Sequence, residues 1–176
     1  MAYITPAELA ERPGARELAQ VATSEHRPIV PAELMDATLR GLPRDLPGSA
    51  WTAADLQDAD AALARIMDAV AEADSTIDGF LTKRGYALPL APVPRLVAGW
   101  SRSIARYLLH KSRISLESND PIVRDYRDAL KLLQLTAEGR FSLGADDAVA
   151  TGGGSTDVRF DAAPQIFGRQ ELRGFR

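Results

Sequence analysis

Residues 77–107, IDGFLTKRGYALPLAPVPRLVAGWSRSIARY, decide the fold of this chain. Two helical patterns in this stretch flank a crossing that carries Pro89, Pro92 and Pro94. Proline lacks the backbone N–H that a helix needs and restricts the residue before it, so helix cannot continue through the crossing. We therefore expect two helices held at a fixed angle by a rigid connection. The stretch holds no set of catalytic groups, which favours a role in assembly.

The helix before the crossing is the longest one that the sequence predicts. Thr52 and Asp55 have the spacing of a capping box at its start. The apolar residues that follow recur at alternating spacings of three and four, which is one face of a helix: Leu56, Ala59, Leu63, Ile66, Val70, Ala73, Ile77 and Phe80. The same pattern would suit a coiled-coil seam, but no partner heptad follows, which favours one face of a helix bundle.

Two further helices are expected after the crossing. The first begins near Val93 and ends near Lys111, with an inner face of Leu96, Val97, Trp100, Ile104, Tyr107 and Leu108. The second begins with an Asp120 cap followed by Pro121, and Gly139 ends it. Its apolar stripe comprises Ile122, Tyr126, Ala129, Leu130, Leu133 and Ala137.

The N-terminal residues predict a shorter helix that is interrupted early. Thr5 and Glu8 form a capping box, with Pro6 at the first helical position. Pro13-Gly14 should stop or kink this helix after about two turns. A second short turn is then expected to reach about Ala22.

Residues 23–50 form a loop-rich insertion with several prolines and glycines. One short helix, from about Pro31 to Arg40, interrupts it. The apolar side of that helix is expected to comprise Leu34, Ala37 or Thr38, and Leu42. With the helices above, residues 1–144 predict a mainly α protein, a small domain of about four to five helices.

The character of the chain changes after Gly144. The TGGGS run at 151–155 has a flexible-linker composition, whereas a phosphate-binding loop would need a Lys followed by Ser or Thr. Residues 158–176 have no helical period and cannot bury a core of their own. We expect residues 145–176 to be a linker and an extended arm that adds a short β-strand to a neighbouring protein. The expected contact residues are Val158, Phe160, Ile166, Phe167, Arg169, Arg173, Phe175 and Arg176.

The composition of the 176 residues excludes several functional classes. Apolar residues make up 45% and charged residues 26%, as in globular proteins. With no cysteine, the chain has no disulfide and no thiolate metal site. We expect no leader and no membrane span, because no apolar run approaches about 18 residues. His26 and His110 lie far from any nucleophile or carboxylate set, so we expect no enzyme, metal or cofactor.

Charge is distributed unevenly across the two central helices. Seven acids and one base lie between Asp55 and Asp78, whereas seven bases and no acid lie between Gly79 and Leu116. Three interpretations stay open: faces that neutralise each other within the fold, complementary faces on adjacent copies in a ring, and a basic face toward DNA. The inter-copy interpretation uses Asp68, Glu72 and Asp74 against Arg95, Arg102, Lys111 and Arg113. Asp78 and Arg106 are expected to form a structural ion pair between the helices.

Several of these residues resemble the head–tail connector, or adaptor, family of Mu-like phages and prophages. The resemblance rests on the opening Thr5-Pro6 helix and above all on the Leu88-Pro89-Leu90, Val93-Pro94 and Ile104–Tyr107 combination. It also covers Asp120-Pro121, Val123-Arg124, Tyr126, and Gly139 to Leu143-Gly144. Residues 23–50 depart from the family pattern as an insertion, and Ser103 stands where an acid is expected.

The resemblance implies a helical structural protein without catalysis or cofactor. It implies a ring of about twelve copies in the neck of the virion, beneath the portal, that joins a tail, stopper or terminator protein. DNA would cross the ring's channel without sequence-specific binding, and the protein would be made in the bacterial cytoplasm. The alternative is a nucleic-acid-binding accessory protein that uses the basic segment 79–116.

Overall fold

The structure, a computed structural model, describes residues 2–44, 51–114 and 120–144. The contact residues expected in the C-terminal arm, Val158 to Arg176, lie outside the described residues. The described part is helical and contains no strand, which confirms the predicted class. Its elements are α1 (Pro6–Leu9), η1 (Ala10–Gly14), α2 (Ala15–Ala22), α3 (Ala32–Arg40), α4 (Ala53–Arg84), α5 (Arg95–His110) and α6 (Pro121–Ala137).

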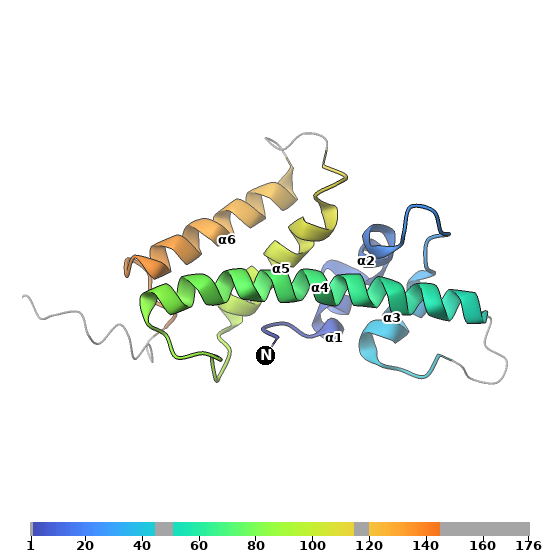
Figure 1. Ribbon diagram of the computed structural model, residues 1–176, viewed down its shortest axis with the longest axis horizontal. Helices are drawn as coiled ribbons and strands as arrows, with labels where there is room; N and C mark the ends of the chain where they lie inside the picture. Colours follow the sequence, from blue (N-terminus) through green and yellow to red (C-terminus); the bar gives the residue numbers. More distant parts are fainter. Residues whose placement is uncertain (1, 45–50, 115–119, 145–176) are drawn as a thin grey trace, which may run out of the picture.

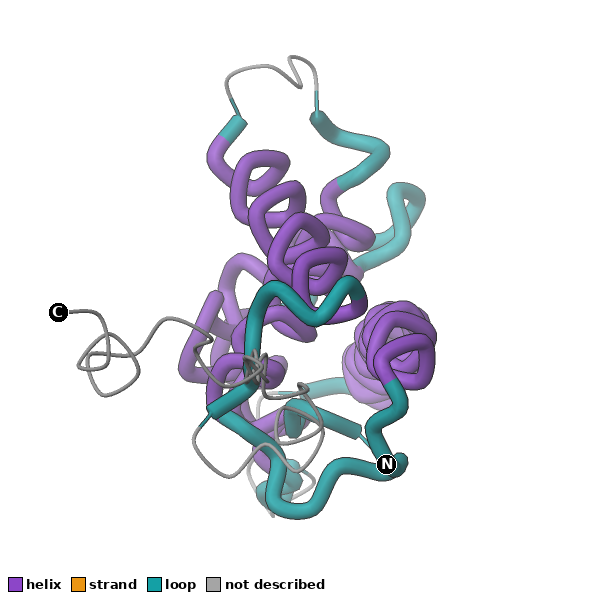
Figure 2. The backbone as a smooth tube through the Cα atoms, turned by 90° about the vertical axis from the view of Figure 1, so that its left-hand side faces the viewer, coloured by secondary structure: helices purple, strands orange, loops and turns teal. Residues whose placement is uncertain are grey.

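Helix α4 is the axis on which the other elements are arranged (Figure 1). Its 32 residues span about 48 Å at the usual helical rise. Helices α5 and α6 pack against each other and against α4, whereas α2 and α3 pack against the part of α4 nearer its N-terminus. Figure 2 looks nearly along α4 and shows the other helices gathered on one side of it. One face of α4 is therefore left uncovered.

The predicted helix starts are confirmed in atomic detail. Thr5 and Glu8 form one capping box, and Thr52 and Asp55 form the other. The Asp120 side chain accepts a hydrogen bond from the Ile122 amide at 2.7 Å, directly ahead of α6. Each cap satisfies amide groups that have no partner within their helix, so these short sequence patterns are enough to fix the starts.

The chain breaks between α1 and α2 where Pro13-Gly14 predicted it. Arg12 leaves helical geometry with φ −153° and ψ 116°. Gly14 has φ 112°, a left-handed backbone conformation that glycine adopts without strain. The break redirects the chain into α2 and sets Arg12 and Pro13 beside α5 and α6, where they line a cleft.

The core follows the predicted face of α4, with corrections at its edges. Ala59, Ile66, Val70, Ala73 and Ile77 are fully or nearly fully buried. Of the expected inward residues in the other helices, Leu42 is 51% exposed and Leu96 is 37% exposed. In the insertion, Leu34 and Thr38 are buried as expected, and Val30, Met35 and Leu39 are buried as well. Leu42 lies beyond the left-handed Gly41 that ends α3, so it does not continue the helical face.

Candidate assembly site

Most of the acids on α4 are used within the described fold. Asp55 caps the helix, Asp58 lies 3.2 Å from Arg27, and Asp60 lies 2.5 Å from Arg44. Asp74 and Asp78 accept hydrogen bonds from the N-terminal segment and α5. Asp68 and Glu72 are exposed, and their carboxylates form no hydrogen bond or ion pair with any residue that the structure describes.

Asp74 is buried and cannot belong to an exposed acidic face, which corrects the sequence interpretation. Its side chain accepts hydrogen bonds from the Ser101 hydroxyl at 2.7 Å and from the Tyr3 amide at 3.0 Å. Burial raises the pKa of this carboxyl above its usual value, although both hydrogen bonds act in the opposite direction. Asp74 thus joins the N-terminal segment to α4 and α5.

The expected Asp78–Arg106 ion pair is wrong, because each residue has another partner. The Asp78 carboxylate accepts a hydrogen bond from the Tyr3 hydroxyl, and burial together with this contact raises the pKa of Tyr3. Arg106 instead pairs with Glu17 through two contacts, Nε to Oε1 at 2.5 Å and Nη2 to Oε2 at 2.9 Å. The His110 ring lies 3.4 Å from the same Glu17 carboxylate. These contacts hold α2 against α5.

The uncovered face of α4 has an unusual composition for a solvent-exposed helix. The outer stripe, as we name it, consists of Ala61, Ala64, Asp68, Ala71, Glu72, Ser75 and Gly79. All seven are exposed and, at about 100° per residue, they share one side of the helix. The two unpaired acids therefore stand on a ridge of small residues.

A cleft of about 580 Å³ lies on the other side of α5, between η1, α2, α5 and α6. Four arginines line it, Arg12, Arg95, Arg102 and Arg106, together with the acids Glu17, Asp125 and Asp128. Its apolar lining comprises Pro13, Leu96, Trp100, Ile122, Ala129 and Leu132. The predicted basic face is thus divided, because Arg95 and Arg102 line the cleft while Lys111 and Arg113 are exposed beyond it.

The cleft contains donors that the described fold leaves without acceptors. Glu17 neutralises Arg106, but Arg12, Arg95 and Arg102 form no ion pair with the described residues. Trp100 is 4% exposed and its indole Nε1 has no hydrogen-bond partner, and the same is true of the buried Arg102 Nε. Buried polar groups are normally satisfied. With four arginines against three acids in its lining, and these two donors unsatisfied, the cleft is suited to a ligand that carries hydrogen-bond acceptors such as carboxylates.

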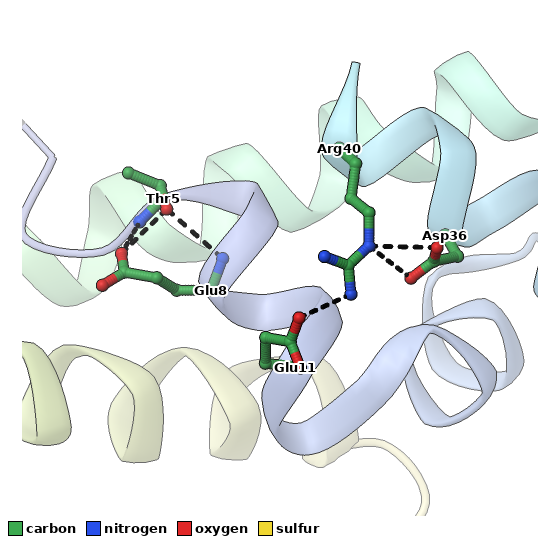
Figure 3. A network of polar contacts seen from close by, with 5 residues as sticks. All are labelled: Thr5, Glu8, Glu11, Asp36 and Arg40. Atoms are coloured by element: carbon green, nitrogen blue, oxygen red, sulfur yellow. Dashed lines mark hydrogen bonds and ion pairs between the residues drawn. The ribbon is translucent and has the colours of Figure 1, made fainter. Parts of the chain in front are cut away.

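A polar cluster beside this region fixes η1 in place (Figure 3). Arg40 donates to Glu11 at 2.7 Å and to Asp36 at 2.9 Å, which ties η1 to α3. The hydrogen bonds that Arg40 donates to Glu11 and Asp36 raise the pKa of Arg40. Because Glu11 immediately precedes Arg12, the cluster also fixes where the chain enters the cleft wall. The Pro13-Gly14 pattern was the sequence signal for this corner, but Arg12 and Trp100 were not identified as site residues.

Two other kinds of feature, a metal site and a membrane span, are absent from residues 2–44, 51–114 and 120–144. No group of three or more His, Cys, Asp or Glu residues there could hold a metal ion. None of the helices in the same ranges has the length and apolar composition to cross a bilayer. His26 is exposed in the turn before α3.

Comparison with known proteins gives the family of the chain. A family model described as "Bacteriophage Mu, Gp36" matches residues 3–160. A curated relative, the "Mu-like prophage FluMu protein gp36" of Haemophilus influenzae, is 34% identical over 112 residues, which cover 64% of this chain and 76% of that protein. The family match includes all six α-helices and begins at Tyr3, the residue that contacts Asp74 and Asp78. The chain therefore belongs to the Mu Gp36 family of phage proteins.

Proposed function

We propose that this chain is a structural head–tail connector that forms a ring between the portal and the tail of a Mu-like phage. The observation that carries the proposal is the family match over residues 3–160. The proline-crossing and Ile104–Tyr107 patterns, through their resemblance to connector proteins, supply the specific role. The ring, of about twelve copies, stands in the neck of the virion and surrounds the path of the DNA.

The distribution of charge supports a head-to-tail ring. Asp68 and Glu72 stand on the outer stripe, whereas Arg95 and Arg102 line the cleft, and Lys111 and Arg113 extend the basic surface. Contacts between different surfaces of identical chains close into rings when the rotation between neighbours closes. Each exposed pair contributes only about 0–1 kcal/mol, so the stability of the ring is collective.

In this proposal residues 145–176 join the ring to its neighbours. The arm adds a strand to an edge of the portal or of an adjacent copy, and its backbone groups are satisfied there without a core of their own. Val158, Phe160, Ile166 and Phe167 are the proposed anchors. Arg169, Arg173, Phe175 and Arg176 would complete the contact surface.

Deletion of the gene from the phage or prophage that encodes this chain tests the proposal. We expect DNA-filled heads and separate tails that do not join, and a plasmid copy of the gene should restore complete particles. Electron microscopy and plaque counts are the readouts. Complete, infectious particles in the absence of the protein would refute the connector function.

The alternative function, sequence-independent nucleic-acid binding, predicts a different result in solution. Exposed Arg95, Lys111 and Arg113 are the observation that favours it, whereas the net charge of −3 opposes it. The purified chain would be titrated into a 30-base-pair duplex at rising salt, since phosphate contacts give a steep salt dependence. We expect no stable complex at physiological salt, and a tight, salt-sensitive complex would favour the alternative.

A further inference from the structure

We propose that the outer stripe of α4 in one copy docks into the cleft between η1, α5 and α6 of the next copy. Asp68 and Glu72 would then meet Arg12, Arg95 and Arg102. This inference rests on the proposed ring and goes further, because it states which two surfaces of the chain form the contact. The partner is a second copy of this chain.

The outer stripe is shaped for close approach by another protein surface. Ala61, Ala64, Ala71, Ser75 and Gly79 leave the backbone of α4 within reach of a partner. A Cβ added at Gly79 would meet nothing within 4 Å, so the fold of one copy does not require glycine there. Glycine in an exposed helix interior destabilises the helix relative to alanine. Close packing of a neighbouring copy on this face would explain why position 79 is a glycine.

The cleft has the complementary chemistry. Arg12 and Arg95 are exposed at its edge and, with Arg102, form no ion pair with the described residues. The charge of Arg102 contributes to the lowered pKa of Glu8. Trp100 Nε1 and Arg102 Nε are buried in its wall without acceptors. The outer stripe carries two carboxylates, which accept hydrogen bonds and donate none. The exposed Arg65 borders the stripe and donates to the Ala22 carbonyl. Small side-chain adjustments, common when interfaces form, would let these carboxylates satisfy the donors.

The two surfaces are different parts of one copy, as a head-to-tail contact requires. Ser101 on α5 contacts the inward-facing Asp74 of α4. Glu72 lies about 160° around α4 from Asp74, at 100° per residue, and so does not face Ser101. It lies on the side of α4 nearer α6, where its charge contributes to the raised pKa of Tyr126. On α5, the residues buried in the core are Val97, Ser101 and Ile104. A different set on the same helix lines the cleft: Leu96, Gly99 and Arg102. One copy can therefore use its stripe and its cleft at once with two different neighbours.

A charge swap tests which surfaces meet. One variant carries Asp68→Lys and Glu72→Lys on the outer stripe, and the other carries Arg12→Glu and Arg95→Glu in the cleft. All four residues are exposed, so both variants should fold with unchanged helix content by circular dichroism. When either variant is expressed alone, the stripe of one copy and the cleft of the next carry charges of the same sign. When the two variants are co-expressed, each reversed stripe can meet a reversed cleft and each unchanged stripe an unchanged cleft, so the charges are opposite again.

The readout is the amount of this chain in purified particles, together with sedimentation of the purified full-length protein. We expect each variant alone to lose incorporation by at least about tenfold, and the co-expressed pair to recover most of it. Matched controls reverse exposed charges outside the outer stripe, the cleft and its basic extension: Glu25→Lys with Glu33→Lys, and Lys131→Glu with Arg140→Glu. We expect incorporation of both controls to match the wild type. Failure of the mixed pair to recover, with normal wild-type incorporation, would overturn the docking and leave the connector function standing.

Cross-linking gives an independent geometric test, since the chain contains no cysteine. Ala64→Cys and Ser103→Cys placed in the same chain should give a ladder of disulfide-linked oligomers in assembled particles. Either substitution alone should give no ladder, because a stripe does not meet a stripe. Efficient dimers from Ala64→Cys alone, or no ladder from the assembled double variant, would overturn the inference. Absence of wild-type protein from particles would instead refute the connector function, and the inference with it.

Discussion

Replacement of Asp74 by alanine should destabilise the fold strongly, although Asp74 lies on a helix rich in exposed acids. The substitution removes the acceptor for the Ser101 hydroxyl and for the Tyr3 amide. Ser101 is 0% exposed and Tyr3 is 6% exposed, so water cannot replace the lost partner. A buried donor without an acceptor costs about 1–3 kcal/mol. With two such donors, and relief of the buried charge in part compensation, we expect a loss of about 2–4 kcal/mol.

Urea denaturation of the full-length protein, followed by circular dichroism at 222 nm, measures this loss. The matched control is Asp68→Ala on the same helix, which should change the free energy of unfolding by less than about 0.5 kcal/mol because Asp68 is exposed. Ser101→Ala should destabilise less than Asp74→Ala, because it removes only one of the two hydrogen bonds. If Asp74→Ala and Asp68→Ala had equal effects, the structural role assigned to Asp74 would be refuted.

Asp74 should also give the stability a defined pH dependence. Its pKa is raised in the folded state, so between the unfolded value of about 4 and the higher folded value the folded chain binds more protons than the unfolded chain. The contribution of Asp74 to stability is therefore largest at low pH and is lost as pH rises through the folded pKa. Asp74→Asn should remove this contribution, and the difference in unfolding free energy between wild type and variant, measured from pH 4 to 8, should show it. A difference independent of pH would contradict the assignment.

Three further changes test other parts of the structure. Glu17→Ala should lower the free energy of unfolding by about 1–2 kcal/mol in urea denaturation, since it leaves the half-buried Arg106 without its bidentate partner. Asp78→Ala should leave the pairing of Arg106 with Glu17 unaffected. Gly139→Ala should lower the free energy of unfolding by about 1 kcal/mol or more, because Gly139 has φ +75° and a Cβ there would lie 2.9 Å from Arg84 Nη1. The control is Gly99→Ala, where a Cβ would meet nothing within 4 Å, and this variant should not destabilise the fold. Truncation after Gly154 should leave helix content unchanged but prevent the joining of heads to tails, and infectious particles with truncated protein would exclude the arm as a connector.

Local sequence patterns were sufficient wherever the determining contacts lie within a few residues. Thr5 with Glu8 and Thr52 with Asp55 cap their helices through contacts three residues apart. Gly85, which ends α4, works through bonds to Leu81 and Thr82. The capped helix starts were therefore predictable from residue type and spacing, before any knowledge of how the helices pack.

The contacts that define the candidate site could not be predicted in this way. Arg106 and Glu17 are 89 residues apart, and their pairing depends on how α2 lies along α5. The interpretation of α4 as an acidic face counted Asp74 with the exposed acids, because a helical period does not show which acid has a buried partner. Ser101 was the available signal: a polar residue among Val97, Trp100 and Ile104 on a buried face requires a partner.

The fold pairs some of its charged side chains with one another and leaves others unpaired, and the unpaired ones are available for contacts between copies. Arg27 and Arg44 of the 23–50 insertion pair with Asp58 and Asp60, so the insertion neutralises the N-terminal part of α4. The N-terminal segment occupies Asp74 and Asp78 near the other end. Between these covered regions the acids left free are Asp68 and Glu72. The same division applies to the cleft, where Glu17 neutralises Arg106 but Arg12, Arg95 and Arg102 form no ion pair with the described residues. Intramolecular pairing thus leaves two carboxylates on the outer stripe and three guanidinium groups at the cleft without an ion pair, and a second copy offers the complement of both.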